Sequence, residues 1–155
     1  MPIIHVARIP DDGEHLDGEE DGSMLELGDD PFARAGGPVR YQLFVQCVSG
    51  ELVLRGTVGA DLNLACARCG EFFSTTVSDS SFLRAYDISE GVESVDVMPD
   101  LREAILLYLP AFPQCKSDCA GLCPQCGANL NNGPCACASP SGGTQWDSLD
   151  SLQLE

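Results

Sequence analysis

Five cysteines fall within the nineteen residues of 119–137, CAGLCPQCGANLNNGPCAC. The residues between them are mostly Gly, Pro, Asn and Ala, and the bulky apolar side chains are limited to Leu122 and Leu130. A segment of this composition cannot bury enough apolar surface to offset the entropy that is lost on folding. We therefore expect bonds to the cysteine sulfurs, either disulfides or metal ligation, to hold this part of the chain.

The cellular compartment decides between these two kinds of bond, because disulfides persist in oxidising compartments whereas paired cytosolic cysteines more often bind metal. The first residues, MPIIHVARIPDDGEHLDGEE, have neither the basic start nor the apolar run of a secretory signal. Nowhere does the sequence hold an uninterrupted apolar stretch of membrane-spanning length. These features predict a cytoplasmic protein that contacts no membrane. The odd number of cysteines, nine, also argues against a closed set of disulfides.

The cysteines stand in pairs whose spacing is typical of zinc sites. Two segments, CARCG (66–70) and CPQCG (123–127), have the C-x2-C-G form, in which two thiolates of one tight turn reach the same ion. The glycine that follows can adopt the positive φ that such a turn often needs. With CKSDC and CAC, these segments supply enough ligands for two tetrahedral zinc ions. The expected ligands are Cys66, Cys69, Cys115, Cys119, Cys123, Cys126, Cys135 and Cys137.

Loop length bears on which cysteines share an ion. Closing a short loop costs less entropy than closing a long one, which favours one site within 123–137 and a second site that joins the pairs 66/69 and 115/119. Two other arrangements stay open: the two C-x2-C-G turns could face each other across one ion, or only one site could be filled. Cys47, inside an expected strand, is left as a buried apolar thiol.

The rest of the chain predicts an α+β fold. Alternating and β-branched residues predict a short strand at 3–9 and longer strands at 39–48, 51–66 and 71–86. Joined by short turns, the longer strands would form an antiparallel sheet that could close into a barrel. The second of these strands is expected either to be long or to bulge at one of its glycines, Gly56 or Gly59.

Two further segments complete this picture. Residues 10–38 are rich in Asp, Glu and Gly, so we expect a mobile acidic insert with little buried surface. The best helix spans 99–109, with Pro99 at its start and Asp100 and Glu103 at capping-box spacing. Its apolar face should cover one side of the sheet.

These elements divide the chain into three parts. We expect a β-rich domain at 1–114, a small zinc-bound module at 115–137 and a tail at 138–155. In the tail, Trp146 and two leucines have helical spacing, which fits either a short docked helix or a frayed end. The module should be unfolded without metal, because its metal-binding free energy is also its folding free energy.

The order of the motifs resembles the YceD family, the large ribosomal RNA subunit accumulation proteins, in the branch with a cysteine-rich C-terminus. The similarity covers roughly residues 39–137: the run GELVLRGTVGADLNLACARCGEFFSTTV, the helix before LP, and CKSDCAGLCPQCGANLNNGPCAC. It implies a bacterial or plastid protein that is needed for large-subunit ribosomal RNA to accumulate, without an established enzymatic activity. Asn129 and Asn131 are expected to cap a turn, since Asn bonds readily to its own backbone. The family pattern falls on Cys66, Arg68, Cys69, Cys115, Cys119, Gly121, Leu122, Cys123, Cys126, Gly127, Asn129 and Asn131.

The formal net charge of −16 limits how such a protein could contact RNA. Residues 1–33 carry ten acids against one arginine, and residues 86–155 carry ten acids against two bases. Residues 34–85 hold five arginines against four acids. Attraction of RNA phosphates over the whole surface is therefore excluded. The chain is better suited to hold a basic protein, or to contact a limited RNA segment through its middle third.

Together with the resemblance, these features predict a non-enzymatic ribosome-assembly factor whose partner is large-subunit ribosomal RNA or a basic large-subunit ribosomal protein. The alternative is a zinc-ribbon adaptor that binds a non-ribosomal protein. Iron–sulfur or thiol redox chemistry is disfavoured, because the local pairs suit closed tetrahedral sites and neither His5 nor His15 has a nucleophile–base arrangement. Guanidinium groups bind phosphate and stack on unpaired bases. The expected contact residues are Arg68, Arg40, Arg55 and Arg84.

Overall fold

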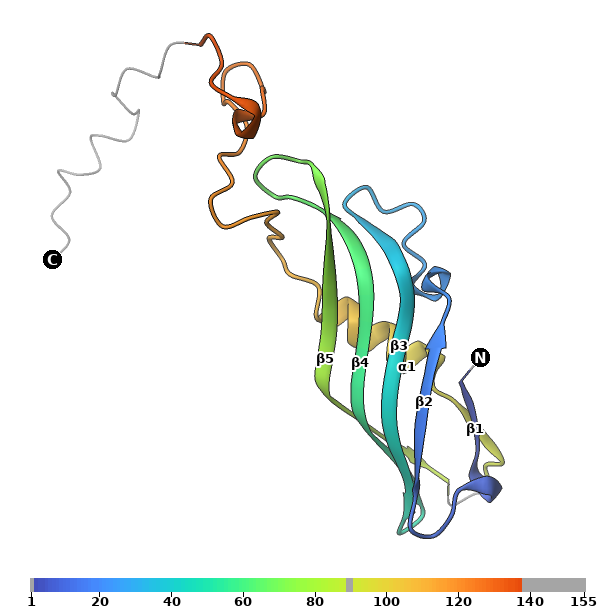
Figure 1. The fold of residues 1–155 in the computed structure, drawn as a ribbon. Helices are drawn as coiled ribbons and strands as arrows, with labels where there is room; N and C mark the ends of the chain where they lie inside the picture. Colours follow the sequence, from blue (N-terminus) through green and yellow to red (C-terminus); the bar gives the residue numbers. More distant parts are fainter. Residues whose placement is uncertain (1, 89–90, 138–155) are drawn as a thin grey trace, which may run out of the picture.

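The fold is an open antiparallel sheet with one helix against it (Figure 1). The structure is a computed structural model that describes residues 2–88 and 91–137. Its four main strands lie in the sheet in chain order, and each pair of neighbours is antiparallel. They are β2 (Glu14–Glu20), β3 (Ala33–Val48), β4 (Glu51–Ala65) and β5 (Phe72–Asp87). The α+β class predicted from the sequence is confirmed.

Strict alternation in the strands explains why the sheet forms and which side it buries. In β4 the side chains of Leu52, Leu54, Val58 and Leu62 are almost fully buried, whereas their neighbours along the strand point to the other face. Because successive side chains of a strand alternate between the two faces, this register fixes one apolar face for the whole sheet. The turn between β3 and β4 follows from Ser49 and Gly50, which both adopt positive φ, as two-residue hairpin turns require.

A bulge interrupts the pairing of β4 with β5. The pairing passes from Gly56/Phe82 to Val58/Asp79, so the extra residue lies in β5, at Ser80 and Ser81, and not at Gly56 or Gly59 of β4 as the sequence suggested. Gly56 is selected by the close approach of β3 instead, because a Cβ at residue 56 would lie 2.0 Å from the carbonyl oxygen of Gln42. The bulge bends β5, and the sheet is strongly curved in Figure 1.

The sheet does not close into a barrel, which corrects that part of the prediction. In the described part of the chain, β2 and β5 each pair with one neighbouring strand and form the two edges. A separate two-stranded sheet of β1 (Ile3–His5) and β6 (Ser94–Asp96) contributes Ile4 and Val95 to the same core as the helix. Because these elements cover the apolar face, closure is not needed to bury it.

The acidic insert is ordered, contrary to the expectation that it is mobile. Residues 14–20 form the edge strand β2, and the short 3-10 helix η2 (Gly22–Leu25) follows. The few apolar residues of the insert explain this order, since Leu25 is completely buried and Leu16 packs against the core. The acids take the exposed positions around them, where charge also protects a sheet edge from further pairing.

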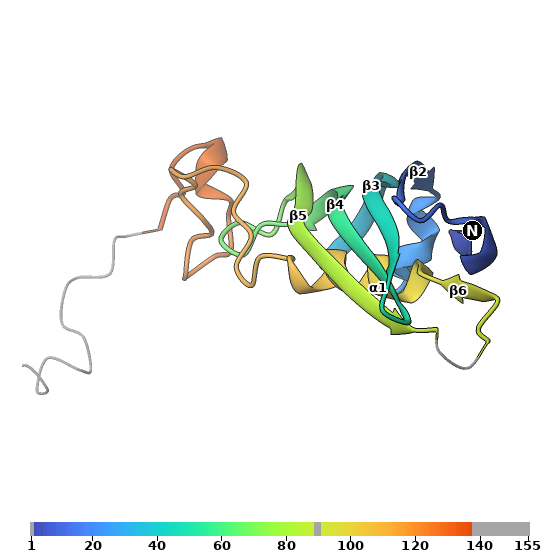
Figure 2. The same ribbon diagram turned by 90° about the horizontal axis from the view of Figure 1, so that it is seen from below.

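The predicted helix is present as α1 (Met98–Leu107) and lies against one face of the sheet (Figures 1 and 2). Leu101 and Ile105 on its inner side are fully buried. The predicted capping box does not form. Instead Asp96 accepts a hydrogen bond from the backbone N–H of Met98, and Asp100 binds Arg84 and Tyr86 of β5.

After α1 the chain runs past the tip of the β4–β5 hairpin and forms the segment drawn in orange in Figure 1. Its regular structure is the short 3-10 helix η3 (Leu130–Asn132) and a bridge between Leu122 and Asn129; a further short 3-10 helix, η1 (Val6–Arg8), follows β1. The predicted tail helix around Trp146 lies outside the described residues. No helix in residues 2–88 and 91–137 is long and apolar enough to cross a membrane.

Candidate metal centres

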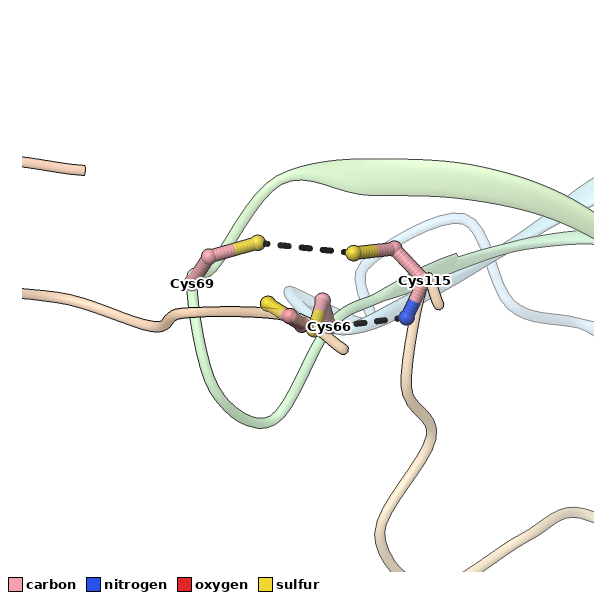
Figure 3. Close-up of side chains that lie close together, drawn as sticks. Cys66, Cys69 and Cys115 are labelled. Carbon is pink, nitrogen blue, oxygen red and sulfur yellow. Dashed lines mark hydrogen bonds between the residues drawn. The ribbon is translucent and has the colours of Figure 1, made fainter. Parts of the chain in front are cut away.

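The first centre lies where the β4–β5 hairpin meets the segment that follows α1. Cys66 and Cys69 stand in the hairpin turn, and Cys115 and Cys119 approach from the later segment. The Sγ atoms of Cys69 and Cys115 are 3.8 Å apart, and those of Cys66 and Cys119 are 3.9 Å apart. Figure 3 shows Cys69 facing Cys115, while the backbone N–H of Cys115 points to the sulfur of Cys66.

These separations fit a single tetrahedral ion. A zinc–sulfur bond of about 2.3 Å places the four sulfurs of a regular tetrahedron about 3.8 Å from one another. All four Sγ atoms of the first centre lie within 4.8 Å of each other. Such a set could hold one ion. The residues present therefore fit a single tetrahedral metal ion with four sulfur ligands.

The second centre is built from the C-terminal segment alone. The Sγ atoms of Cys123, Cys126, Cys135 and Cys137 also lie within 4.8 Å of one another. Cys123 is buried and Cys126 is exposed, so this quartet is more open to solvent than the first, in which three cysteines are buried. Two groups of four cysteines could thus each hold a metal ion.

The two C-x2-C-G turns have the same backbone geometry. Gly70 and Gly127 have φ values of 75° and 74°, as the motif predicts. Each glycine N–H donates to the carbonyl oxygen of the first cysteine of its motif, at 2.8 Å for Gly70 and 2.9 Å for Gly127. A positive φ at this position turns backbone N–H groups towards the sulfurs.

Backbone donors stabilise one thiolate of the first centre. Burial opposes ionisation of Cys66, yet the backbone N–H groups of Cys115, Cys69 and Arg68 outweigh burial and lower the pKa of the Cys66 thiol to about 6. At Cys115, burial and hydrogen bonding to the other cysteines raise the pKa to about 12. The pKa of Cys119 is lowered as well, chiefly by the hydrogen bond from the Asn131 side chain, so the four thiols of this centre ionise unequally.

In the second centre, too, one thiol has a lowered pKa and another a raised pKa. The backbone N–H groups of Cys126 and Gln125 lower the pKa of Cys123 to about 6. Hydrogen bonding to Cys126, followed by burial, raises the pKa of Cys137 to about 12. A bound cation removes this conflict in both quartets, because it stabilises all four thiolates at once.

Asn131, from the loop between Cys126 and Cys135, contacts the first centre. Its side-chain amide donates to the sulfur of Cys119 in the first centre at 3.3 Å, and its carbonyl oxygen accepts from the backbone N–H of Ala120 at 2.9 Å. Asn129 accepts from both the backbone and the side chain of Asn131, so it caps η3 as expected. The bond to Cys119 was not predicted, because nothing in the spacing shows which sulfur a turn residue will face.

Comparisons with known proteins support the resemblance seen in the sequence. The sequence model of the family described as large ribosomal RNA subunit accumulation protein YceD matches residues 54–153, well over half of the chain. The chain belongs to the YceD family.

Relatives of this YceD-family chain occur in mycobacteria and plants. An uncharacterized protein of Mycobacterium tuberculosis is 31% identical over 142 residues, which cover 76% of this chain and 69% of the relative. An uncharacterized protein of Mycobacterium leprae is 29% identical over 109 residues, which cover 61% and 50%. The chloroplastic large ribosomal RNA subunit accumulation protein YCED homolog 1 of Arabidopsis thaliana is 28% identical over 142 residues, which cover 66% and 44%. No solved structure matches the chain.

The structure groups the eight cysteines of the YceD-family chain as loop length favours. The C-x2-C-G turns belong to different quartets, so they do not face each other across one ion. The division expected between residues 114 and 115 separates Cys115 from its neighbours Cys66 and Cys69 at the hairpin tip. Cys47 is half-buried in β3 beside the core and belongs to neither quartet.

The four arginines expected to contact a partner differ in their surroundings. Arg40 pairs with Asp61 at 2.8 Å, and half-buried Arg84 pairs with Asp100 at 2.8 Å on the face that α1 covers. Arg68 and Arg55 are exposed, and neither forms an ion pair with another residue of the described chain. Arg68 and Arg55 are therefore the exposed candidates for contact with a partner, whereas Arg84 holds α1 against the sheet.

The sequence did not predict an apolar concavity of about 610 Å³ that lies beside Arg68. Phe32, Phe72 and Leu122 contribute exposed apolar side chains to its wall. Arg34 lies over the Phe72 ring, with Cζ 4.2 Å from the ring centroid. These residues come from segments far apart in sequence, so no spacing signals their proximity.

Proposed function

We propose that this YceD-family chain is a non-enzymatic ribosome-assembly factor that supports the accumulation of large-subunit ribosomal RNA. The observation that carries the proposal is the family match over residues 54–153, whose description names this role. The chloroplastic relative carries the same description in its name. We place the action of the chain in the cytoplasm, where bacterial ribosomes are assembled.

Zinc is the proposed metal, with one ion in each quartet. The all-thiolate donor sets and the tetrahedral spacing of the sulfurs favour zinc, which has no need for an open coordination position in a structural site. Four protein ligands per ion leave no position for a substrate or an activated water molecule. This closed ligation supports a structural rather than a catalytic use of the metal.

The first centre would fix Arg68 at the surface. Arg68 lies between the ligands Cys66 and Cys69, and its backbone N–H is directed to the Cys66 sulfur. The backbone of Gly121 packs on the same residue, because a Cβ at 121 would lie 3.2 Å from the Arg68 carbonyl oxygen. Metal ligation therefore presents an exposed guanidinium on a rigid turn, which reduces the entropy lost when it binds a phosphate or a base.

The proposed contact is a limited one. With a net charge of −16, the chain repels an extended RNA backbone, and Arg40 and Arg84 are already paired with carboxylates. The free arginines favour a short RNA segment as the partner. A basic large-subunit ribosomal protein is the other outcome that the experiment distinguishes.

The test is recovery of partners on the tagged protein from its own cells, with and without RNase. We expect precursors of the large subunit to be recovered, and RNase to remove them. Recovery of one basic ribosomal protein that resists RNase would replace RNA with protein as the partner. A set of partners without ribosomal material would contradict the proposed function and favour the zinc-ribbon adaptor.

Arg68→Glu makes this test specific to the first centre. The substitution reverses an exposed charge and leaves every cysteine in place, so metal content should not change. We expect recovery of ribosomal material to fall, whereas Arg8→Glu, at an exposed position in η1, should leave it unchanged. Equal recovery with both variants would assign Arg68 no role in the contact.

A further inference from the structure

The face of the sheet opposite α1 is not covered by any described element of the chain. The core lies on the other side, where α1 contacts β4 and β5 (Figure 2). The open face is mostly polar, as antiparallel sheets allow. One row of side chains that crosses all four strands departs from this pattern.

This row is set by the strand register. His15 of β2 is paired with Phe44 of β3, Phe44 with Arg55 of β4, and Arg55 with Leu83 of β5. Directly paired residues of antiparallel strands project their side chains to the same face of the sheet. His15, Arg55 and Leu83 are exposed and Phe44 is half-buried, so the row forms a band of ring, cation and apolar surface at the solvent.

The side chains of the row touch one another. The His15 and Phe44 ring centroids are 5.1 Å apart, with the ring planes at 63°. The Arg55 guanidinium lies over the same Phe44 ring, with its Cζ atom 5.0 Å from the ring centroid. In contrast to Arg40 on the same face, Arg55 has no carboxylate partner among residues 2–88 and 91–137.

The band borders a broad, open concavity of about 960 Å³. The bulge of β5 at Ser80 and Ser81, opposite Gly56 and Thr57 of β4, contributes to this hollow. Gln42, Thr57 and Ser80 line it beside the rings and supply amide and hydroxyl groups that can donate and accept hydrogen bonds. The concavity therefore combines a stacking surface, a free cation and groups able to bind the edge of a flat polar molecule.

The Phe44 ring is held in place by the backbone of the residue that precedes β2. Gly13, with φ of 79°, lies so close to it that a Cβ at residue 13 would be 2.6 Å from Cζ of Phe44. A ring packed on a glycine backbone loses little further freedom when a ligand stacks against this band. The platform is thus formed before binding.

We propose that this open-face site, formed by His15, Phe44, Arg55 and the bulge hollow, binds an unpaired base of single-stranded RNA. The inference rests on the proposed function and adds the chemical class of the contact. Unpaired bases stack on aromatic rings and on guanidinium planes, and the cation of Arg55 complements the adjacent phosphate. A duplex does not fit, because its bases are already stacked and its phosphates would meet Asp17 at the same hollow.

The experiment uses the full chain loaded with zinc and a fluorescently labelled, unstructured RNA of about ten nucleotides, followed by fluorescence anisotropy. Phe44→Leu keeps an apolar side chain and removes the ring, and Arg55→Gln removes the cation. We expect each variant to weaken binding about tenfold, since stacking of one base has that order of effect. For Arg55→Gln the dependence of affinity on salt should also become weaker, by about one unit of slope.

Phe112→Leu is the matched control, because Phe112 is a more exposed phenylalanine that lines neither of the two concavities. It should bind the RNA as the unchanged protein does. Zinc content and thermal unfolding, measured for every variant, separate loss of binding from loss of the fold. Arg55 is exposed, so Arg55→Gln is expected to fold even if Phe44→Leu does not.

Two results would overturn the inference: no binding of the RNA by the unchanged protein, or equal affinities for Arg55→Gln, Phe44→Leu and Phe112→Leu. Its failure is distinct from failure of the proposed function. If ribosomal precursors are still recovered from cells with Arg55→Gln at the unchanged level, the assembly role stands and the contact lies elsewhere. If no ribosomal material is recovered with any form, the assembly role itself is contradicted.

Discussion

Four sulfur atoms within 4.8 Å of one another repel one another when they are ionised, unless a cation binds between them. Without metal, the thiols of the first quartet ionise unequally: burial opposes ionisation of Cys66, yet backbone donors outweigh burial and lower the pKa of Cys66 to about 6, whereas burial raises the pKa of Cys115 to about 12. A bound metal ion would replace this mutual repulsion with four metal–sulfur bonds. At the level of single residues, we therefore propose that metal ligation holds the C-terminal segment in its fold.

Replacing both Cys123 and Cys126 with Ser should remove one of the two metal ions and leave the other. The second quartet loses half of its ligands, whereas the first keeps all four. We expect zinc analysis to give one ion per chain and residues 120–137 to become sensitive to protease, with the sheet still folded. Cys47→Ser, outside both quartets, should keep both ions. Two ions retained in the double variant would contradict the grouping.

Asp79 links pH to the stability of the sheet. Its buried carboxylate accepts hydrogen bonds from the backbone N–H and the hydroxyl of Ser81, at 2.8 and 3.0 Å. Burial opposes ionisation of Asp79, yet these bonds outweigh burial and lower its pKa. The folded-state pKa is thus below the unfolded value of about 3.9. The ionised carboxylate therefore stabilises the fold above that pH, and this contribution is lost as the pH falls through the folded-state pKa.

Asp79→Asn should lower the free energy of unfolding at pH 7 by about 1–2 kcal/mol, since charge-assisted hydrogen bonds are weakened. It should also reduce the difference in stability between neutral and acid pH. Thermal unfolding followed across the acid range measures both effects. Asp12→Asn, at an exposed position, is the control. An unchanged pH profile in Asp79→Asn would show that other carboxylates set the acid response.

At the scale of elements, the part of β4 around Gly56 has two roles: it packs tightly in the sheet, and it lines the hollow of the open-face site. Gly56→Ala should destabilise the sheet by about 1–3 kcal/mol, because the added Cβ would lie 2.0 Å from the Gln42 carbonyl oxygen and the strands must separate. Gly28→Ala is the matched control, since a Cβ there has no atom within 4 Å. Equal unfolding midpoints for both variants in a denaturant titration would contradict the close approach of β3 to β4 at Gly56.

The elements that the sequence predicts well are those with strong periodicity. The long strands, the β3–β4 turn and α1 follow from alternation, a Ser-Gly pair and an apolar helix face. The strand β2 was missed because its composition, EHLDGEE, is dominated by acids, and Leu16 is its single large aliphatic residue. The sequence also could not predict that the sheet stays open, since closure into a barrel depends on strand tilt and on which elements cover the core.

The metal centres were more predictable than the surfaces. Cysteine spacing and loop length indicated both quartets, because ligation needs only a few residues in fixed geometry. The row of His15, Phe44 and Arg55 joins three strands, and its register depends on turns and on a bulge. Nothing local in the sequence marks such a row.

At the scale of the whole molecule, charge and metal ligation act together. The chain is strongly acidic, with a net charge of −16, so it cannot bind RNA by general attraction to phosphates. Contacts must instead come from a few fixed positions, and Arg68 at the first centre and Arg55 on the open face are exposed and free of ion pairs within the described residues. Such a protein would hold a short exposed segment during assembly and release it without competing for the rest of the RNA.

The measurement that tests the central claim most directly is the ratio of large-subunit to small-subunit ribosomal RNA in cells depleted of the protein. The proposed function predicts that this ratio falls on depletion and is restored by the unchanged gene. A gene with Cys66→Ser and Cys69→Ser, which dismantles the first centre, should not restore it. An unchanged ratio in fully depleted cells would contradict a role in the accumulation of large-subunit RNA.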